Sequence, residues 1–203
     1  MFPLLAGCAN PPVKVEHFVP LTATAREDIV MRGEYPFIEH SDKDHWISAT
    51  LAGAQSVYIV SLKVVNKTAA DLEPEDYSVS LVDGRDAKPL SLISREAVIG
   101  YRAHLAGGGQ ELKSGSPMAD IALAQLNKVV GSLGETQKSE LLQSIDSAIE
   151  HYFAFRPIYA GEARDGVLCY YPNFILEYPL ILKLKLRDKT LDLKFWPPKV
   201  DKP

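Results

Sequence analysis

The stretch LILKLKLRDKTLDLKF, residues 180–195, decides the fold class of this chain. Leucines alternate with isoleucine or lysine over 180–186, and apolar residues alternate with Asp or Lys over 191–195. A period of two with one apolar and one charged face is typical of half-buried antiparallel strands. The polar residues 187–190 between the two runs predict a loop. The stretch therefore predicts a β-hairpin of fixed register, because a slip by one residue would expose the leucine row.

Two earlier stretches, residues 57–65 and 77–81, show the same alternation. Asn66-Lys67-Thr68 predicts a turn after the first stretch. Asp83-Gly84 follows the second stretch and predicts a hairpin, because this pair tolerates the positive φ angles of a type I′ turn. Strands at both ends of the chain, with turn residues between them, predict a mainly antiparallel β-sandwich.

A helical period appears between the two groups of strands. Ser116-Pro117 resembles an N-cap followed by proline at the first helical position, and apolar residues then recur at helical spacing as far as Leu133. A second run covers 141–153, and the short connection predicts an antiparallel αα-hairpin. Residues 94–105 are expected to form a further short helix. The predicted fold class is therefore α+β, with a helical insertion at about 94–155.

Composition excludes several classes of protein. The chain has 203 residues, of which 46% are hydrophobic and 24% charged, so intrinsic disorder is excluded. The formal net charge is −4, and no run of Lys or Arg offsets it locally, which argues against a nucleic-acid partner. No apolar stretch approaches the roughly 20 residues that a membrane-spanning helix needs.

The N-terminus carries a short motif, Leu5-Ala6-Gly7-Cys8. An aliphatic residue, two small residues and a cysteine resemble the lipobox of bacterial lipoproteins. The resemblance implies that the Cys8 thiol receives diacylglycerol, that the chain is cut before it, and that the new N-terminus is acylated. Membrane attachment would then run through this lipid. Ala9, in place of an Asp, implies the outer membrane, with the protein facing the periplasm.

The residues before Cys8 depart from a full signal peptide, since none of the seven is basic and one is Pro3. We therefore interpret residues 1–7 as the remnant of a signal peptide. Residues 8–20, which include Pro11-Pro12, are expected to be an extended tether. Residues 21–203 are expected to form a single β-sandwich domain that contains the helical insertion.

Cys8 and Cys169 are the only cysteines. If Cys8 carries lipid, Cys169 has no partner and is expected to be an inert, buried residue of a strand. A Cys8–Cys169 disulfide is the alternative for an oxidising compartment.

The order of strands and turns resembles an immunoglobulin-like domain over roughly residues 45–90 and 157–196. Similar domains are common in bacterial envelope lipoproteins. The inserted helices depart from a plain sandwich of this kind.

His40, Asp42 and His45 form the only cluster of possible metal ligands. Imidazole nitrogens and carboxylates bind zinc and similar ions. No other His or Cys is placed to complete a site, however, and Lys43 repels a cation. We therefore expect a solvated loop here and no metal or other cofactor.

Aromatic residues concentrate between 152 and 178. Tyr152, Tyr159, Tyr170 and Phe174 are candidates for lining a ligand pocket between the helices and the sheet. The alternative is that they fill the core where helix meets sandwich, and we favour the core, because aromatic side chains bury large apolar areas.

No catalytic motif emerges. Gly107-Gly108-Gly109 precedes Lys113, but Leu112 stands where a phosphate loop needs glycine. The sequence therefore predicts a non-enzymatic, membrane-anchored envelope lipoprotein that binds or supports a protein or another envelope component. The alternative is a periplasmic small-ligand-binding protein or an enzyme, with its site at the junction of helices and sheet.

Overall fold

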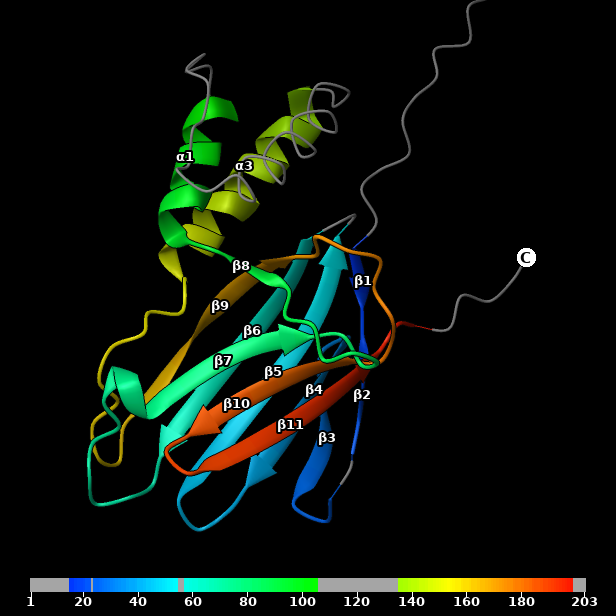
Figure 1. Ribbon diagram of the computed structural model, residues 1–203. Coiled ribbons are helices and arrows are strands. Elements are labelled where there is room, and N and C mark those ends of the chain that lie inside the picture. Colours follow the sequence, from blue (N-terminus) through cyan, green and yellow to red (C-terminus); the bar gives the residue numbers. More distant parts are fainter. Residues whose placement is uncertain (1–14, 23, 55–56, 106–134, 199–203) are drawn as a thin grey trace, which may run out of the picture.

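The alternating strands pair into two antiparallel sheets that stack face to face, with two helices at one end (Figure 1). The computed structural model describes residues 15–22, 24–54, 57–105 and 135–198. The large sheet has the order β3-β4-β5-β6-β9-β8, with β1 paired to the end of β5, and the small sheet has the order β2-β11-β10-β7. This arrangement bears out the predicted antiparallel β-sandwich.

The bounds of the elements are as follows. The large sheet contains β1 (Val15–His17), β3 (Glu27–Arg32), β4 (Tyr35–Ser41), β5 (His45–Ala54), β6 (Val57–Asn66), β8 (Ser91–Ile93) and β9 (Ala163–Tyr171). The small sheet contains β2 (Val19–Leu21), β7 (Tyr77–Val82), β10 (Leu180–Leu186) and β11 (Lys189–Trp196). The helices are α1 (Arg95–Leu105) and α3 (Glu135–Glu150), and a 3-10 turn, η1, covers Pro74–Asp76.

The core lies between the two sheets, where the apolar faces of the strands meet. Every second residue of β6 is buried, as the alternation predicts. The predicted hairpin β10–β11 is present, with Leu182 opposite Leu193 and Leu184 opposite Leu191. The largest fully buried side chains come from both sheets, from the segment before η1 and from the segment after α3: Ile38, Ile47, Leu51, Leu62, Leu72, Leu81, Phe153, Ile158, Leu168, Tyr170, Leu180 and Phe195.

Two predicted turns differ from the structure. The β10–β11 loop is shorter than the expected 187–190, because Lys189 already pairs with Leu186. The prediction of a type I′ turn at Asp83-Gly84 is wrong. Here the Asp83 carboxylate accepts hydrogen bonds from the N–H groups of Asp86 and Lys88, and Ala87, not Gly84, has positive φ.

The two described helices pack against each other beyond β8 and β9 (Figure 1). Helix α1 confirms the short helix expected within 94–105, and its Val98 and Tyr101 pack on Ile145 of α3. Arg102 and Asp146 form an ion pair at 2.8 Å across the same interface. The helix expected over 117–133, and with it the αα-hairpin, lies outside the described residues.

Helix α3 ends at Glu150, three residues before the expected end at Phe153. The following segment is extended and pairs with β9: the Phe153 N–H donates to the Val167 carbonyl at 2.9 Å, and the Val167 N–H donates to the His151 carbonyl at 2.7 Å. Phe153 is thereby fully buried between the sheets. Because its ring is buried in the core, Phe153 lies in this extended segment and not in a further turn of α3.

The strands begin inside the expected tether of residues 8–20. β1 starts at Val15, and Phe18 between β1 and β2 is buried in the core. Residues 15–20 are therefore part of the sandwich. Cys8 and the expected signal-peptide remnant, residues 1–7, lie outside the described residues.

Candidate functional site

A row of polar residues crosses the outer face of the large sheet. Glu39 of β4 lies opposite Ser48 of β5, Ser48 opposite Lys63 of β6, and Lys63 opposite Asp165 of β9. Successive side chains of a strand point to opposite faces, so the neighbours Ile47, Ala49 and Leu62 face the core while this row faces outward.

A cavity of about 500 Å³ opens on this face, where the segment after α3 meets the sheet. Its lining takes Ser48, Ser61, Lys63 and Asp165 from the sheet. From the other side come residues of the α3 end and the segment after it: Glu150, His151, Tyr152, Ala154 and Arg156. Arg32, Phe37, Arg164 and Val167 complete most of the wall. The cavity thus lies at the junction of helix and sheet.

The charge balance of this lining is basic, although the whole chain has a net charge of −4. Four basic residues, Arg32, Lys63, Arg156 and Arg164, face two acidic ones, Glu150 and Asp165. Arg32 is held by an ion pair to Glu39 and lies 4.7 Å from the centre of the Phe37 ring. The other three basic residues still outnumber the two carboxylates, which favours an anionic group in the cavity.

Two buried polar atoms at the cavity have no hydrogen-bond partner within the described ranges. They are Ser48 Oγ, on a side chain only 1% exposed, and Arg164 Nε. Another guanidinium nitrogen of Arg164, Nη2, donates a hydrogen bond to the Pro157 carbonyl at 2.9 Å. An unpaired buried polar group costs about 1–3 kcal/mol, so a ligand oxygen that bonds to such a group recovers stabilisation.

A second, smaller cavity of about 280 Å³ lies at the end of the sandwich where the β4–β5 turn approaches the β10–β11 turn. The three residues that we singled out as weak metal candidates, His40, Asp42 and His45, all line it. Ile47, Leu186 and Leu191 supply its apolar wall, and Arg26, Lys189 and Thr190 add polar groups.

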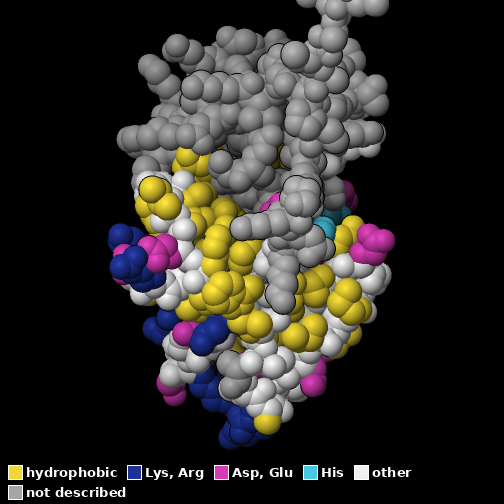
Figure 2. Space-filling model, turned by 90° about the vertical axis from the view of Figure 1, so that its right-hand side faces the viewer, with side chains coloured by type: hydrophobic (Ala, Val, Ile, Leu, Met, Phe, Trp, Pro, Cys, Tyr) yellow, Lys and Arg dark blue, Asp and Glu magenta, His cyan; other side chains and the backbone are white. Residues whose placement is uncertain are grey.

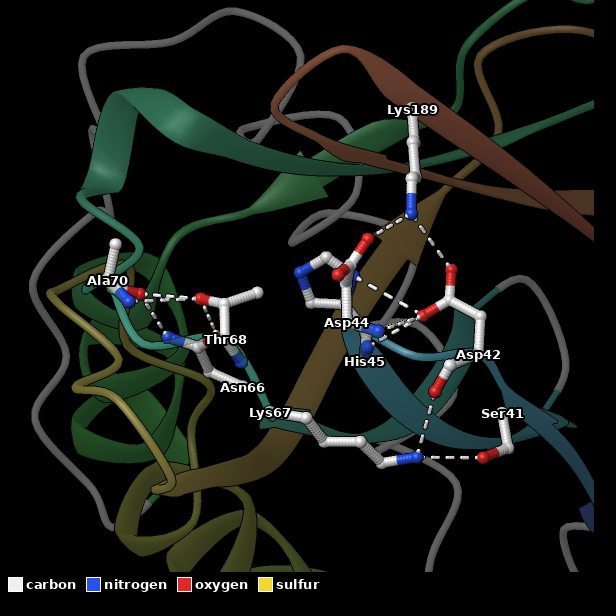
Figure 3. A network of polar contacts seen from close by, with 9 residues as sticks. All are labelled: Ser41, Asp42, Asp44, His45, Asn66, Lys67, Thr68, Ala70 and Lys189. Carbon is white, nitrogen blue, oxygen red and sulfur yellow. Dashed lines mark hydrogen bonds and ion pairs between the residues drawn. The ribbon is translucent and has the colours of Figure 1, made fainter.

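Asp42 ties the two sheets together at this end (Figure 3). One carboxylate oxygen accepts the backbone N–H groups of Asp44 at 2.8 Å and His45 at 2.7 Å. The other accepts Lys189 Nζ at 3.2 Å, and Lys189 also pairs with Asp44. Burial acts to raise the pKa of Asp42, but these hydrogen bonds and the lysine charge outweigh it and lower the pKa to about 2.

His45 is only 4% exposed, which contradicts the solvated loop expected around it. Burial lowers its pKa, more strongly than the nearby Asp42 raises it, so the imidazole is neutral at neutral pH. No three His, Cys, Asp or Glu residues in the described part of the chain are grouped so that they could hold a metal ion. The cluster is therefore a link between the sheets that is buried at His45 and exposed at Lys189.

The turn after β6 appears in the same view (Figure 3). Asn66 is fully buried, and its side-chain amide donates to the carbonyls of Ala70 at 2.8 Å and Ile158 at 3.0 Å. Its side-chain oxygen accepts the Thr68 hydroxyl at 2.7 Å. Asn66 therefore fixes the predicted turn.

The four aromatic pocket candidates do not line a common cavity, and three of them support the core alternative: Tyr170 belongs to the core, and Tyr152 and Phe174 pack against it. Tyr152 lines the large cavity and donates its hydroxyl to the Ile93 carbonyl at 2.7 Å. Tyr170 is in the core, Tyr159 is 53% exposed, and Phe174 packs partly against the core with Lys88 near its ring. Of these four, only Tyr152 lines either of the two cavities described above.

Cys169 is a free, buried thiol on β9. Burial raises its pKa to about 11, so the thiol is protonated at neutral pH and unsuited to nucleophilic attack. The inert role that we expected for this residue is consistent with its burial.

No motif in the sequence marks Ser48, Lys63 or Arg164 as a site residue. The alternation of β5 and β6 indicates that Ser48, Ser61 and Lys63 share the outer face. The approach of residues 150–156 has no comparable local pattern.

Neither described helix is long and apolar enough to cross a membrane. Comparison of the chain with family models, with curated proteins and with solved structures finds no match.

Proposed function

We propose that this chain is a non-enzymatic binding module of the bacterial cell envelope that accepts an anionic group of a partner protein or envelope component. The observation that carries the proposal is the cavity on the outer face of the large sheet, with its basic lining and its unpaired Ser48 hydroxyl. Lipid on Cys8 would hold the module at the outer membrane, facing the periplasm. The sandwich would be of the immunoglobulin-like kind, with an inserted αα-hairpin.

Binding is favoured over catalysis by the state of the nucleophile candidates. Ser48 and His151 line the same cavity, but Ser48 Oγ has no hydrogen-bond partner among the residues that the structure describes. A serine nucleophile needs a base within hydrogen-bond reach, and His151 makes no hydrogen bond to this hydroxyl. The buried Cys169 thiol is protonated, as described above.

A small-ligand carrier is the second candidate, and the position of the same cavity favours it. Glu150 at the end of α3, together with His151 and Tyr152, closes one side of the cavity. A volume of about 500 Å³ falls within the usual range for small-molecule sites. The two candidates differ in whether the anionic group belongs to a free molecule or to a macromolecule.

Titration with inorganic phosphate and with glucuronate, followed by the amide signals of a 15N-labelled chain, tests the cavity. We expect the shifted amides to cluster on β5, β6, β9 and residues 150–156. Replacing Lys63 with glutamine is expected to weaken binding about tenfold, because a hydrogen bond to a charged group is lost.

Lys185→Gln is the matched control, since Lys185 is exposed on β10 in the small sheet and its replacement removes the same charge. It should bind both probes as the unaltered chain does. Equal weakening by the two substitutions, or shifts spread evenly over the surface, would show that only general charge attracts the probes. Binding of neither probe would refute the anion site.

Cys8→Ala tests the membrane anchor. When the chain is expressed in its bacterial host from its own gene with the upstream DNA intact, we expect it in the membrane fraction and in the detergent phase. Each buried methylene of an acyl chain contributes about 0.8 kcal/mol, so several chains hold the protein firmly. Cys8→Ala should move it to the soluble fraction, and Cys169→Ala should not. An unaltered chain that stays soluble would end the lipoprotein proposal.

A further inference from the structure

Strand β3 forms one edge of the large sheet, and no described strand pairs with its outer side. An edge strand presents unpaired N–H and C=O groups that another strand can join. Natural edges are often protected by charged side chains, above all lysine, by proline or by a bulge. The sequence of β3, EDIVMR, contains neither lysine nor proline, and its charged residues are Glu27, Asp28 and Arg32. Figure 2 shows this side of the molecule, where hydrophobic side chains gather along the middle.

The two faces of β3 differ in character. Ile29 lies opposite Ile38, a core residue, so Ile29 and Met31 share the inner face of the sheet. They are nevertheless 47% and 59% exposed. On the outer face, Val30 lies opposite Phe37, between Asp28 and Arg32. The edge therefore carries two apolar side chains on the inner face of the sheet. On the outer face it carries a valine between two residues of opposite charge.

Asp28 lies in an unfavourable electrostatic position. It is directly opposite Glu39 of β4, and like charges opposite each other destabilise a sheet. Arg32 forms an ion pair with Glu39, and Asp28 has no ion pair among the described residues. One cation thus serves two carboxylates on this face.

We propose that β3 pairs antiparallel with β3 of a second copy of this chain, about a two-fold axis at Val30. In this register Asp28 lies opposite Arg32 of the second copy, and Ile29 lies opposite its Met31. Each Asp28 gains the cation that it lacks. The two large sheets join into one, and both pairs of exposed apolar residues become neighbours.

Alternative registers do not match. When the two large sheets join into one, the inner faces of both copies lie on the same side, so an inner residue of β3 pairs only with an inner residue. The two-fold axis must therefore pass through a residue, and it can shift along β3 only by whole residues. An axis at Ile29 places Asp28 opposite Val30, and an axis at Met31 places Val30 opposite Arg32. Only the axis at Val30 pairs opposite charges with each other and apolar side chains with apolar ones.

Analytical ultracentrifugation tests the proposal on the full 203-residue chain with Cys8 replaced by serine, so that neither lipid nor a Cys8 disulfide affects the mass. We expect the mass to rise with concentration from 22.4 kDa toward twice that value. Asp28→Arg places Arg opposite Arg in both symmetric pairs and should raise the dimer dissociation constant at least about tenfold. Arg32→Asp should act likewise, and the double variant Asp28→Arg/Arg32→Asp should restore dimers.

The matched control is Asp188→Arg, the same charge change at an exposed position of the β10–β11 turn, which should dimerise normally. Thermal melting checks that each variant folds, because Arg32 also pairs with Glu39 and lines the large cavity. If Arg32→Asp does not fold, Asp28→Arg and hydrogen exchange of the chain with an unaltered β3 decide whether the proposed dimer forms. In that chain, the β3 amides should gain protection from exchange as the protein concentration rises. A monomer at every concentration, or an Asp28→Arg chain that dimerises unchanged, would overturn the proposal. A folded double variant that stays monomeric would overturn the register.

Discussion

Replacing Phe153 with alanine is expected to lower the free energy of unfolding by about 3–5 kcal/mol, the usual cost of a large cavity in a core. The Phe153 ring is fully buried between the sheets. The distance between ring centres is 6.4 Å to Tyr77 and 5.5 Å to Phe155. It also anchors the segment that leads from α3 back into the sandwich. Urea unfolding, followed by circular dichroism, measures the change.

Tyr159→Ala is the control for this substitution, because it removes a similar ring from the same segment at a position that is 53% exposed. Its effect should stay within about 0.5 kcal/mol. A Phe153→Ala chain as stable as the control would mean that the segment after α3 is not part of the core. The helices would then be attached to the sandwich more loosely than the structure indicates.

Gly166→Ala is expected to push the segment 151–153 away from β9. A Cβ atom at Gly166 would lie 2.7 Å from the backbone of Phe153 and 2.7 Å from the His151 carbonyl oxygen, closer than such contacts allow. Backbone atoms cannot move aside as a flexible side chain can. We expect a loss of about 1–3 kcal/mol from overpacking, and more if the hydrogen bonds to Val167 break. Thermal melting measures the loss, and hydrogen exchange at the Val167 amide locates it.

The same substitution connects stability to the proposed site, because His151 and Tyr152 form part of the cavity wall. Gly166→Ala should therefore weaken binding of phosphate and glucuronate as well as stability. Ala163→Ser, at the exposed start of β9, is the control and should change neither property. Unchanged melting and unchanged Val167 protection in Gly166→Ala would contradict the close approach of the two segments.

The two cavities differ in what they contribute. In the small cavity, Lys189 bonds across the sheets to Asp42 and Asp44, and the buried His45 is neutral. These contacts satisfy most of the charge that the cavity contains, so we assign it a structural role. Buried polar atoms without a hydrogen-bond partner among the described residues occur at both cavities, since His40 Nδ1 and His45 Nε2 lie at the small one. The large cavity has the greater volume, about 500 Å³ against 280 Å³, and four basic side chains against two acidic ones. That difference is the reason for placing the proposed function on the outer face of the large sheet.

Much of the sandwich could be predicted because a strand with one buried face shows its period locally. The alternation over 180–195 predicted the hairpin and its buried face, since a slip by one residue would expose leucines, but it did not predict that Lys189 pairs with Leu186. The alternation over 57–65 likewise indicated which side chains face the core. The turns were less predictable: the Asp83 carboxylate reorganises its own loop, and Gly84 is constrained by Pro179 from a distant segment, whose carbonyl oxygen would lie 2.2 Å from an added Cβ.

The sequence by itself determined the strands β6, β7, β10 and β11, their buried faces and the short helix α1, because periodicity and local hydrogen bonding are properties of neighbouring residues. Only the tertiary structure decided where α3 ends, since the burial of Phe153 depends on both sheets. It alone brought Lys189 to Asp42, 147 residues away, and Arg156 to the cavity that Lys63 lines. Contacts between distant segments leave no local pattern, because their energy depends on how the sheets stack.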